Sequence, residues 1–313
     1  MLAGCLGSNE NCPSTLLPAP IPTVTPNPIS SPVQVTTNPN PFGGCIGEDP
    51  NCNASPILNP LLGEFLVNTY ITNSQDKPSI ASNSNGDFVI TWQSNGQDGN
   101  GNGIYAQKFN ADGTPLGSEV RVNSYTSNSQ SLPVITYLSN GDFVISWTSY
   151  GQDNYYDGVY AKRYNSAGVP QGPEFKVNAN TIDSQTNSAI ASTTNGGFII
   201  TWQSNGQDGS GFGIYTQKFN ADSSTLGSEV RVNTYTTNSQ ENPVIASNSN
   251  GDFVISWQSN GQDGSGNGIY AKRYNSAGVP QGPEFKVNTY TTNNQENPAI
   301  ASNSNGDFII AWQ

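Results

Sequence analysis

Five tryptophans recur along the chain at a constant interval, with numbers that rise by 55 each time: Trp92, Trp147, Trp202, Trp257 and Trp312. An Asn-Gly pair precedes each of them at the same distance, first at Asn85-Gly86 and last at Asn305-Gly306. A fixed period of this length, without insertion or deletion, is typical of a repeat architecture with one supersecondary unit per period. Such a unit buries its apolar faces against its neighbours, so the copies are expected to stack.

One period contains four strand-like runs, at residues 78–82, 88–92, 104–109 and 119–122. The second run is apolar on both faces, as expected of a strand that lies between two layers, whereas the last two runs alternate. The Asn-Gly pair between the first two runs predicts a two-residue type I′ hairpin, in which both residues have positive φ. No segment has helical periodicity of useful length.

Four antiparallel strands per repeat favour an all-β fold, a β-propeller-like array of four-stranded antiparallel blades. A string of independent small sandwiches is the main alternative, although a single period is short for a domain with its own core. A parallel β-helix fits less well, because its turns are shorter and its strands do not form Asn-Gly hairpins.

The N-terminal segment 1–62 differs in composition from the rest, since it holds all four cysteines, 12 of the 21 prolines and no Lys or Arg. We therefore predict a disordered Pro/Thr/Asn-rich stalk or linker at 1–62 and a β-repeat domain at 63–313. The repeat domain spans about 4.6 periods, opening on a strand at 64–67 and stopping after the second strand of a fifth unit. This count predicts an incomplete array that belongs to a larger multidomain chain.

The cysteines form two copies of one Cys-x6-Cys motif, Cys5 with Cys12 and Cys45 with Cys52. Each pair could close a small disulfide loop, which is consistent with an oxidising, extracellular or cell-surface location. Zinc bound by four thiolates is the alternative, but the spacing differs from that of the usual zinc knuckle.

Charge and composition exclude several functions. The net charge of −12 argues against binding to nucleic-acid phosphates. The chain has no histidine, which excludes Ser-His-Asp catalysis and His-ligated zinc. No apolar stretch is long enough for a membrane span.

The segments 250–257, 261–271 and 284–288 resemble the tandem repeats of large secreted bacterial proteins, especially cyanobacterial ones, described as haemolysin-type or RTX-like calcium-binding proteins. The resemblance covers 63–313 and recurs in every period. It implies export, calcium binding and an extracellular or surface location. The nonapeptide that defines the family, G-G-x-G-x-D-x-U-x, is absent from the sequence.

The Gly-rich loop between the second and third strands of each repeat is a candidate calcium site. Its first copy, Asp98-Gly-Asn-Gly-Asn-Gly103, matches the D-x-[DN]-x-[DN]-G half of a calcium loop. The copies share one carboxylate and have no Glu at the twelfth position, so calcium binding would be weak. The alternative is a flexible hairpin loop whose Asp accepts hydrogen bonds from its own backbone. The candidate ligands are Asp98, Asn100, Asn102, Asp153, Asp157, Asp208, Ser210, Asp263, Ser265 and Asn267.

These features predict a secreted or cell-surface adhesion or binding module, with a glycan or a surface protein as partner and weakly bound calcium as cofactor. Tyr155 and Tyr156 occur in one copy only and are candidates for exposed contacts. We do not expect an enzyme, because glycoside hydrolysis needs two carboxylates at one site and the acidic residues recur symmetrically. The alternatives are a propeller-type glycoside hydrolase or lyase and a purely structural spacer.

Overall fold

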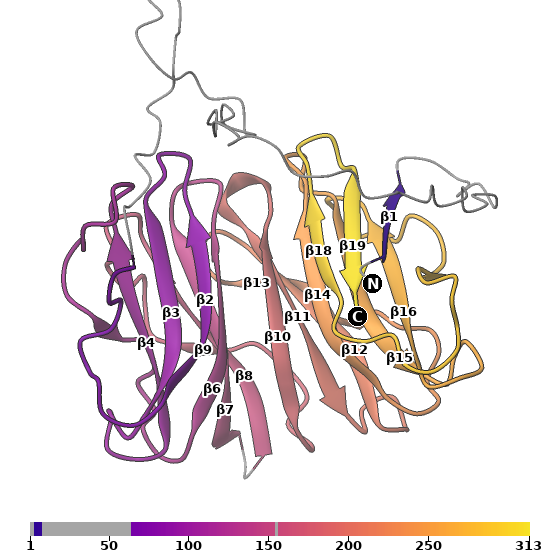
Figure 1. Cartoon of the computed structure of the whole chain (residues 1–313), viewed down its shortest axis with the longest axis horizontal. Helices are drawn as coiled ribbons and strands as arrows, with labels where there is room; N and C mark the ends of the chain where they lie inside the picture. Colours follow the sequence, from indigo (N-terminus) through magenta and orange to yellow (C-terminus); the bar gives the residue numbers. More distant parts are fainter. Residues whose placement is uncertain (1–2, 8–63, 154–155) are drawn as a thin grey trace, which may run out of the picture.

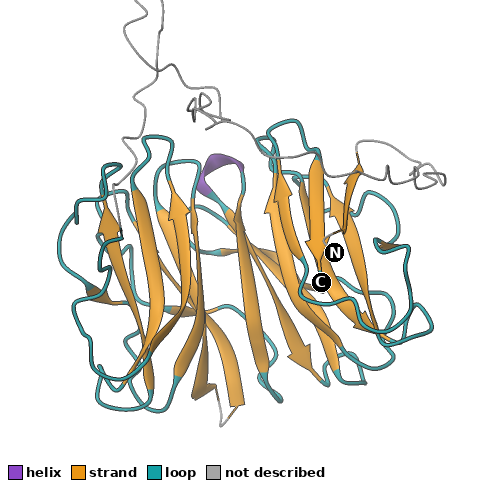
Figure 2. Cartoon of the chain, viewed as in Figure 1, coloured by secondary structure: helices purple, strands orange, loops and turns teal. Residues whose placement is uncertain are grey.

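The computed structural model describes residues 3–7, 64–153 and 156–313, which fold into five antiparallel sheets side by side (Figures 1 and 2). The first to fourth sheets each have four strands in sequence order. Their first, inner strands are β2 (Gln75–Ser82), β6 (Gln130–Tyr137), β10 (Gln185–Ser192) and β14 (Gln240–Ser247). Their second strands are β3 (Phe88–Asn95), β7 (Phe143–Asp153), β11 (Phe198–Asn205) and β15 (Phe253–Asn260).

The two outer strands of each sheet complete the repeat. The third strands are β4 (Asn102–Phe109), β8 (Tyr156–Tyr164), β12 (Phe212–Phe219) and β16 (Asn267–Tyr274). The fourth strands are β5 (Val120–Arg121), β9 (Phe175–Lys176), β13 (Thr225–Arg231) and β17 (Phe285–Lys286). The predicted all-β array of four-stranded antiparallel blades is thus confirmed, and the four runs of each period form its strands in the predicted order.

The fifth sheet is assembled from both ends of the chain. Its strand order is β1 (Ala3–Gly7), β19 (Phe308–Trp312) and β18 (Ala299–Ser302), with β1 antiparallel to β19. The strand predicted at 64–67 does not form. Instead, the Phe65 ring packs edge-on against Phe109 of the first sheet, with 5.4 Å between ring centroids. The stalk prediction falls mostly on residues outside the described ranges, and the predicted disulfides involve side chains that the structure does not describe.

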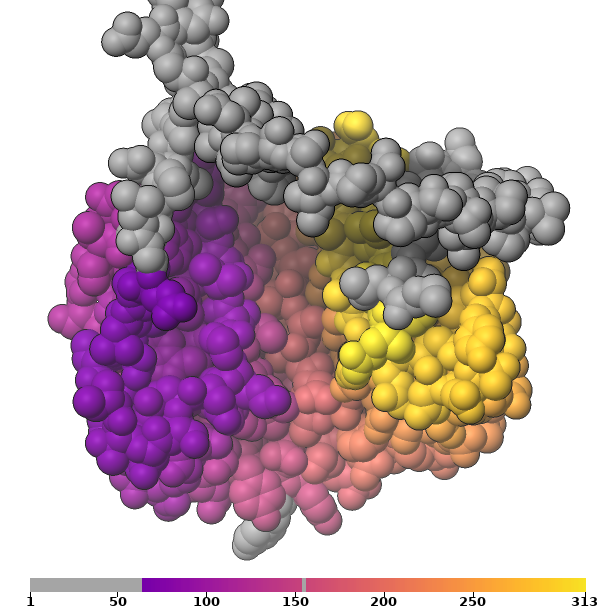
Figure 3. All heavy atoms as spheres, viewed as in Figure 1, coloured from indigo at the N-terminus to yellow at the C-terminus, as the bar shows by residue number. Residues whose placement is uncertain are grey.

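The inner strands lie next to one another in the order β2, β6, β10, β14 and β18, as the innermost strands of propeller blades do. The fourth strands lie on the outside. Figure 3 shows the surface hollowed between the first sheet (violet) and the fifth sheet (yellow). We call this hollow the recess.

Consecutive sheets bury their apolar faces against each other. Val89 and Ile104 of the first sheet pack in one cluster with Ile145 and Trp147 of the second, and the later pairs of sheets repeat this contact. The side chains of Trp147, Trp202 and Trp257 are fully buried. Removing a buried aromatic side chain of this size costs about 3–5 kcal/mol, so the periodic tryptophans hold the array together.

The hairpin between the first two strands of each sheet differs from the prediction. Gly86 has a φ of 87°, but Asn85 is not among the described residues with positive φ. The Gly86 N–H donates to the Asn83 carbonyl at 3.1 Å, so the turn is a three-residue loop whose glycine alone is left-handed. Only the third sheet has the predicted pair of positive φ values, at Asn195 (59°) and Gly196 (75°).

A glutamate in or just before each fourth strand ties its sheet to the segment that precedes the sheet. Glu174 accepts hydrogen bonds from the backbone N–H of Ser124, in the preceding segment, and from Gln152 Nε2 at 2.8 Å. The equivalent acids make the same pair of contacts: Glu119, Glu229 and Glu284. These periodic carboxylates are therefore occupied by structural hydrogen bonds.

A buried tyrosine on each third strand predicts unfolding in alkali. Burial raises the pKa of these side chains from 10.0 to about 12: Tyr105, Tyr160, Tyr215 and Tyr270. The unfolded chain loses these protons at a lower pH than the folded chain, so the stabilisation is complete below pH 10 and is lost as pH rises towards about 12. Burial lowers the pKa of Lys162 and Lys272. These two lysines therefore act opposite to the tyrosines: they favour the unfolded chain as pH falls below their ordinary pKa, because the unfolded lysines bind protons more tightly.

We expect the urea midpoint of unfolding to fall steeply between about pH 10 and pH 11.5, and Tyr215→Phe to make that fall shallower. Phe198→Leu, which keeps all tyrosines, is the control and should lower the midpoint equally at every pH. An unchanged wild-type midpoint across this range would contradict the prediction.

Candidate functional site

The predicted calcium loops are each organised by a buried asparagine. The Asn123 side-chain oxygen accepts the Ile104 N–H at 2.7 Å, and its amide donates to Gln130 Oε1 at 3.0 Å and to Asp98 Oδ2 at 3.3 Å. The same amide-to-carboxylate contact joins Asn178 to Asp153, Asn233 to Asp208 and Asn288 to Asp263. The recurrence of this Asp in every copy is thus explained by its bond to a buried amide.

The other predicted ligands have separate partners. Asn102 accepts a hydrogen bond from Asn95, and Asp157 accepts one from Ser184 at 3.2 Å. The backbone N–H groups of Asn100, Ser210 and Ser265 donate to the Asp at the start of their own loops, as in the hairpin-loop alternative. Within residues 64–153 and 156–313, no three or more Asp, Glu or Cys side chains gather to hold a metal ion. Calcium binding at these ten positions stays a prediction.

The second sheet departs from the other loops. Its second strand continues to Asp153, which is 5% exposed and forms an ion pair with Lys176 at 3.3 Å. Burial raises the pKa of Asp157, which lies in the facing strand. Tyr150 and Tyr156 are exposed at the end of this hairpin, as predicted for Tyr156, whereas Tyr155 lies outside the described residues.

A chain of side-chain amides links the inner strands near the residues where they begin, at the bottom of Figure 1. The Asn187 amide donates to Asn242 Oδ1 at 3.0 Å, and the Asn242 amide donates to Asn297 Oδ1 at 3.4 Å. All three residues have a φ of 52°. Asn187 and Asn242 lie at irregularities in the pairing of β10 and β14, and Asn297 lies just before β18. We call these three residues the amide arc. Lys77 and Leu132 hold the equivalent places in the first two sheets and also have positive φ.

Glutamines of the second strands fix the amide arc to the sheets. Gln203 Oε1 accepts the Asn242 N–H at 2.9 Å, and Gln258 Oε1 accepts the Asn297 N–H at 3.2 Å. In both cases the glutamine belongs to one sheet and the asparagine to the next. The irregular backbone N–H groups are therefore satisfied across the seam between sheets, which holds the arc in place.

Two carboxylates stand directly before members of the amide arc. Glu241 Oε2 accepts a hydrogen bond from Gln258 Nε2 at 3.4 Å, and Glu296 Oε1 accepts one from Asn267 Nδ2 at 2.8 Å. Both carboxylates are half-buried, and β14 lies beside β18. Because Gln258 also accepts the N–H of Asn297, it connects the neighbourhoods of the two acids.

These acids break the repeat, which is the signal that sequence reasoning missed. The five residues at this position, 55 apart, are Asp76, Ser131, Thr186, Glu241 and Glu296. The sequence interpretation considered the acids that recur and found no unique set. A comparison of the five periods position by position would have shown that carboxylates occupy this place in some copies only.

Glu241, Glu296 and the amide arc form a surface suited to a polar, uncharged ligand. Side-chain amides both donate and accept hydrogen bonds, which matches the hydroxyl groups of sugars. Two neighbouring carboxylates can supply the acid and the base, or the nucleophile, that cleavage of a glycosidic bond requires. The surface is formed by β10, β14 and the segment leading into β18, and the inner strands border the recess.

No protein-family model matches the chain, and no curated protein sequence matches it. Solved propeller structures, in contrast, superpose on the chain. An α-L-arabinofuranosidase of Fusarium graminearum superposes with a TM-score of 0.54 and 13% identity, over 77% of this chain and 76% of that one. An α-L-arabinanase of Penicillium chrysogenum, complexed with arabinobiose, has a TM-score of 0.52 and 16% identity, over 77% and 76% of the two chains. At such identities the likeness shows the fold alone.

These comparisons correct the sequence interpretation. The resemblance to RTX-like calcium-binding repeats is wrong, because the similar structures are glycoside hydrolase propellers and no sequence family supports it. The prediction of a non-enzymatic binding or adhesion module is overturned by the same neighbours, which are enzymes. None of the helices in the described residues is long and apolar enough to cross a membrane.

Proposed function

We propose that this protein hydrolyses glycosidic bonds of a polysaccharide, with Glu241 and Glu296 as its catalytic carboxylates. The observation that carries the proposal is the placement of two carboxylates that only some copies have, Glu241 on β14 and Glu296 in the segment leading into β18, each bonded to an amide of the fourth sheet. The periodic acids are occupied by structural hydrogen bonds and do not offer such a pair.

In the proposed reaction, one carboxylic acid protonates the leaving glycosidic oxygen. The other, ionised carboxylate either attacks the anomeric carbon or removes a proton from the attacking water. Gln258 and Asn267 orient the two carboxylates, since each donates a hydrogen bond to one of them. Asn242 and Asn297 offer amide groups to the hydroxyls of the bound sugar.

A neutral, arabinose-containing glycan is the substrate class that we propose. The amide arc carries no charge of its own, and the two superposed enzymes are named for α-L-arabinosyl substrates. Such polysaccharides lie outside the cell that degrades them, so we also propose an extracellular or cell-surface location. The paired Cys-x6-Cys motifs are consistent with that location.

The test is an activity screen of the full chain. Purified protein is incubated with arabinan, arabino-oligosaccharides, xylan and galactan, and new reducing ends are measured. We expect release of short oligosaccharides from arabinan by the wild-type protein and none by the double variant Glu241→Gln/Glu296→Gln. Product formation by the double variant at the wild-type rate, or no product from any glycan, would overturn the proposal.

A further inference from the structure

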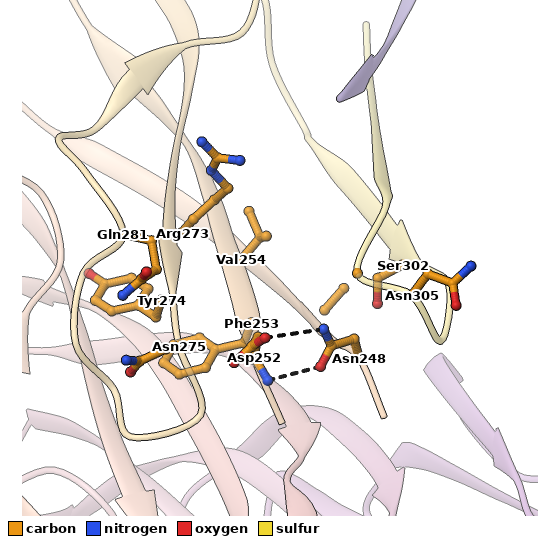
Figure 4. Close-up of a pocket in the computed structure, with 12 residues that line it drawn as sticks. Asn248, Asp252, Phe253, Val254, Arg273, Tyr274, Asn275, Gln281, Ser302 and Asn305 are labelled. Carbon is orange, nitrogen blue, oxygen red and sulfur yellow. Dashed lines mark hydrogen bonds between the residues drawn. The ribbon is translucent and has the colours of Figure 1, made fainter. Parts of the chain in front are cut away.

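A second polar surface lies at the opposite end of the strands from the amide arc. It is a cavity of about 690 Å³ between the fourth and fifth sheets, shown in Figure 4. The turn between β14 and β15, the end of β16 and the turn between β18 and β19 contribute to it. Its polar lining includes Asn248, Asp252, Arg273, Gln281, Ser302 and Asn305.

Arg273 lines this cavity, and its guanidinium has no hydrogen bond or ion pair among the described residues. Its counterpart Arg163 lies in a segment of identical sequence, since residues 161–178 and 271–288 are the same. Arg163 nevertheless forms an ion pair with Asp142 of its own sheet. The difference therefore arises from the surroundings of the two segments and not from their local sequence.

The surroundings of Arg273 explain its free guanidinium. Asp252, the counterpart of Asp142, accepts the Ser276 N–H at 2.8 Å and a hydrogen bond from Asn248. The equivalent lysines of the first and third sheets, Lys108 and Lys218, donate to backbone carbonyls of the sheet that follows. Between the fourth and fifth sheets, Arg273 has no such carbonyl partner among the described residues and lines the cavity instead.

We propose that this cavity binds an acidic saccharide, with Arg273 pairing with the carboxylate of a uronic acid residue. A guanidinium presents a planar fork of N–H donors that fits a carboxylate in two parallel hydrogen bonds. Asn248, Gln281 and Asn305 supply amides, and Ser302 a hydroxyl, for the sugar hydroxyl groups. The volume lies within the range of about 300–1,000 Å³ that small-molecule sites have.

The net charge of the whole chain disfavours a ligand with densely packed negative charge. The net charge of −12 opposes approach of a compact dianion such as phosphate, whereas an oligomer of uronic acids spreads its charge at one carboxylate per sugar, and one such carboxylate is enough to pair with Arg273. This site is separate from Glu241 and Glu296, so it does not depend on the proposed hydrolysis.

The proposal is tested by calorimetry of the full chain with trigalacturonate, with arabinotriose and inorganic phosphate as the other probes. Trigalacturonate should bind, and Arg273→Gln should weaken binding at least about tenfold, which corresponds to about 1.4 kcal/mol. Arg163→Gln is the matched control and should leave the affinity unchanged. Arg273→Lys keeps the charge without the fork and should give an intermediate affinity with an unchanged melting temperature.

Several results would overturn this assignment. They are no binding of trigalacturonate at about 10 mM, equal affinity in Arg273→Gln, or preference for phosphate over trigalacturonate. Loss of binding in Glu241→Gln/Glu296→Gln would place the acidic sugar at the inner strands and would also reject the cavity. Conversely, binding that persists in that double variant keeps this proposal even if no glycan is hydrolysed.

Discussion

Replacing either Glu241 or Glu296 by glutamine is expected to lower kcat on the hydrolysed glycan by about 10²–10⁴-fold, the usual contribution of a general acid or base. Glutamine keeps the volume and one oxygen of the side chain, but it neither gives nor takes a proton at neutral pH. The two residues act on one bond, so the double variant should be little worse than the poorer single variant. Initial rates of reducing-end release on arabinan measure these effects.

Two further measurements separate chemistry from folding. Asp112→Asn, in an exposed turn of the first sheet, is the control and should keep full activity and the wild-type melting temperature. The pH–rate profile of each glutamine variant should lose one limb, because one titrating group has been removed from a pair. A single variant that keeps more than about a tenth of the wild-type kcat would show that its carboxylate is not a proton donor, base or nucleophile.

Replacing Asn233, one of the four equivalent buried asparagines, by alanine is expected to cause a large loss of stability. Asn233 is 2% exposed, accepts the Ile214 N–H at 2.8 Å and donates to Gln240 Oε1 at 3.0 Å. It also donates to the Asp208 carboxylate at 3.2 Å. Alanine would leave these buried groups without partners, which costs about 1–3 kcal/mol each before relaxation, so we expect a loss of about 3–5 kcal/mol.

Urea unfolding followed by tryptophan fluorescence gives the change in free energy. Asn220→Ala is the matched control, because Asn220 bonds to Ser224 in an exposed turn of the same sheet, and it should cost less than about 1 kcal/mol. Asn233→Asp should be as harmful as alanine, since its carboxylate would face that of Asp208 and offer no N–H. Equal losses for Asn233→Ala and Asn220→Ala would show that the buried amide is not a structural centre of the sheet.

The constant period of the repeat was sufficient to predict the number, order and direction of the strands in the first to fourth sheets. Strand formation and turn chemistry depend on neighbours in the chain, and each strand is only a few residues from its partner. The periodic tryptophans likewise indicated packing between sheets, because a unit this short cannot bury both of its faces alone. The predicted type I′ turn was wrong for the other sheets, because only the third sheet has both residues of the Asn-Gly pair, Asn195 and Gly196, at positive φ.

The candidate site could not be predicted in the same way. Asn187, Asn242 and Asn297 belong to three different periods, yet their side chains form hydrogen bonds in sequence. Their contact depends on the inner strands lying side by side, which is a property of the stacked array and not of any one repeat. The same is true of Glu241 and Glu296, whose importance follows from the contact between the fourth and fifth sheets, which brings β14 next to β18 and the segment that leads into it.

Local sequence therefore decided the strands, the turns and the apolar faces, since these depend on residues close together in the chain. Stacking decided which polar groups meet. Residues 161–178 and 271–288 are identical, but Arg163 pairs with Asp142 while Arg273 faces a cavity. The physical reason is that hydrogen bonds and ion pairs act over a few ångströms, so a side chain's partner is set by the groups that the stacked array places around it.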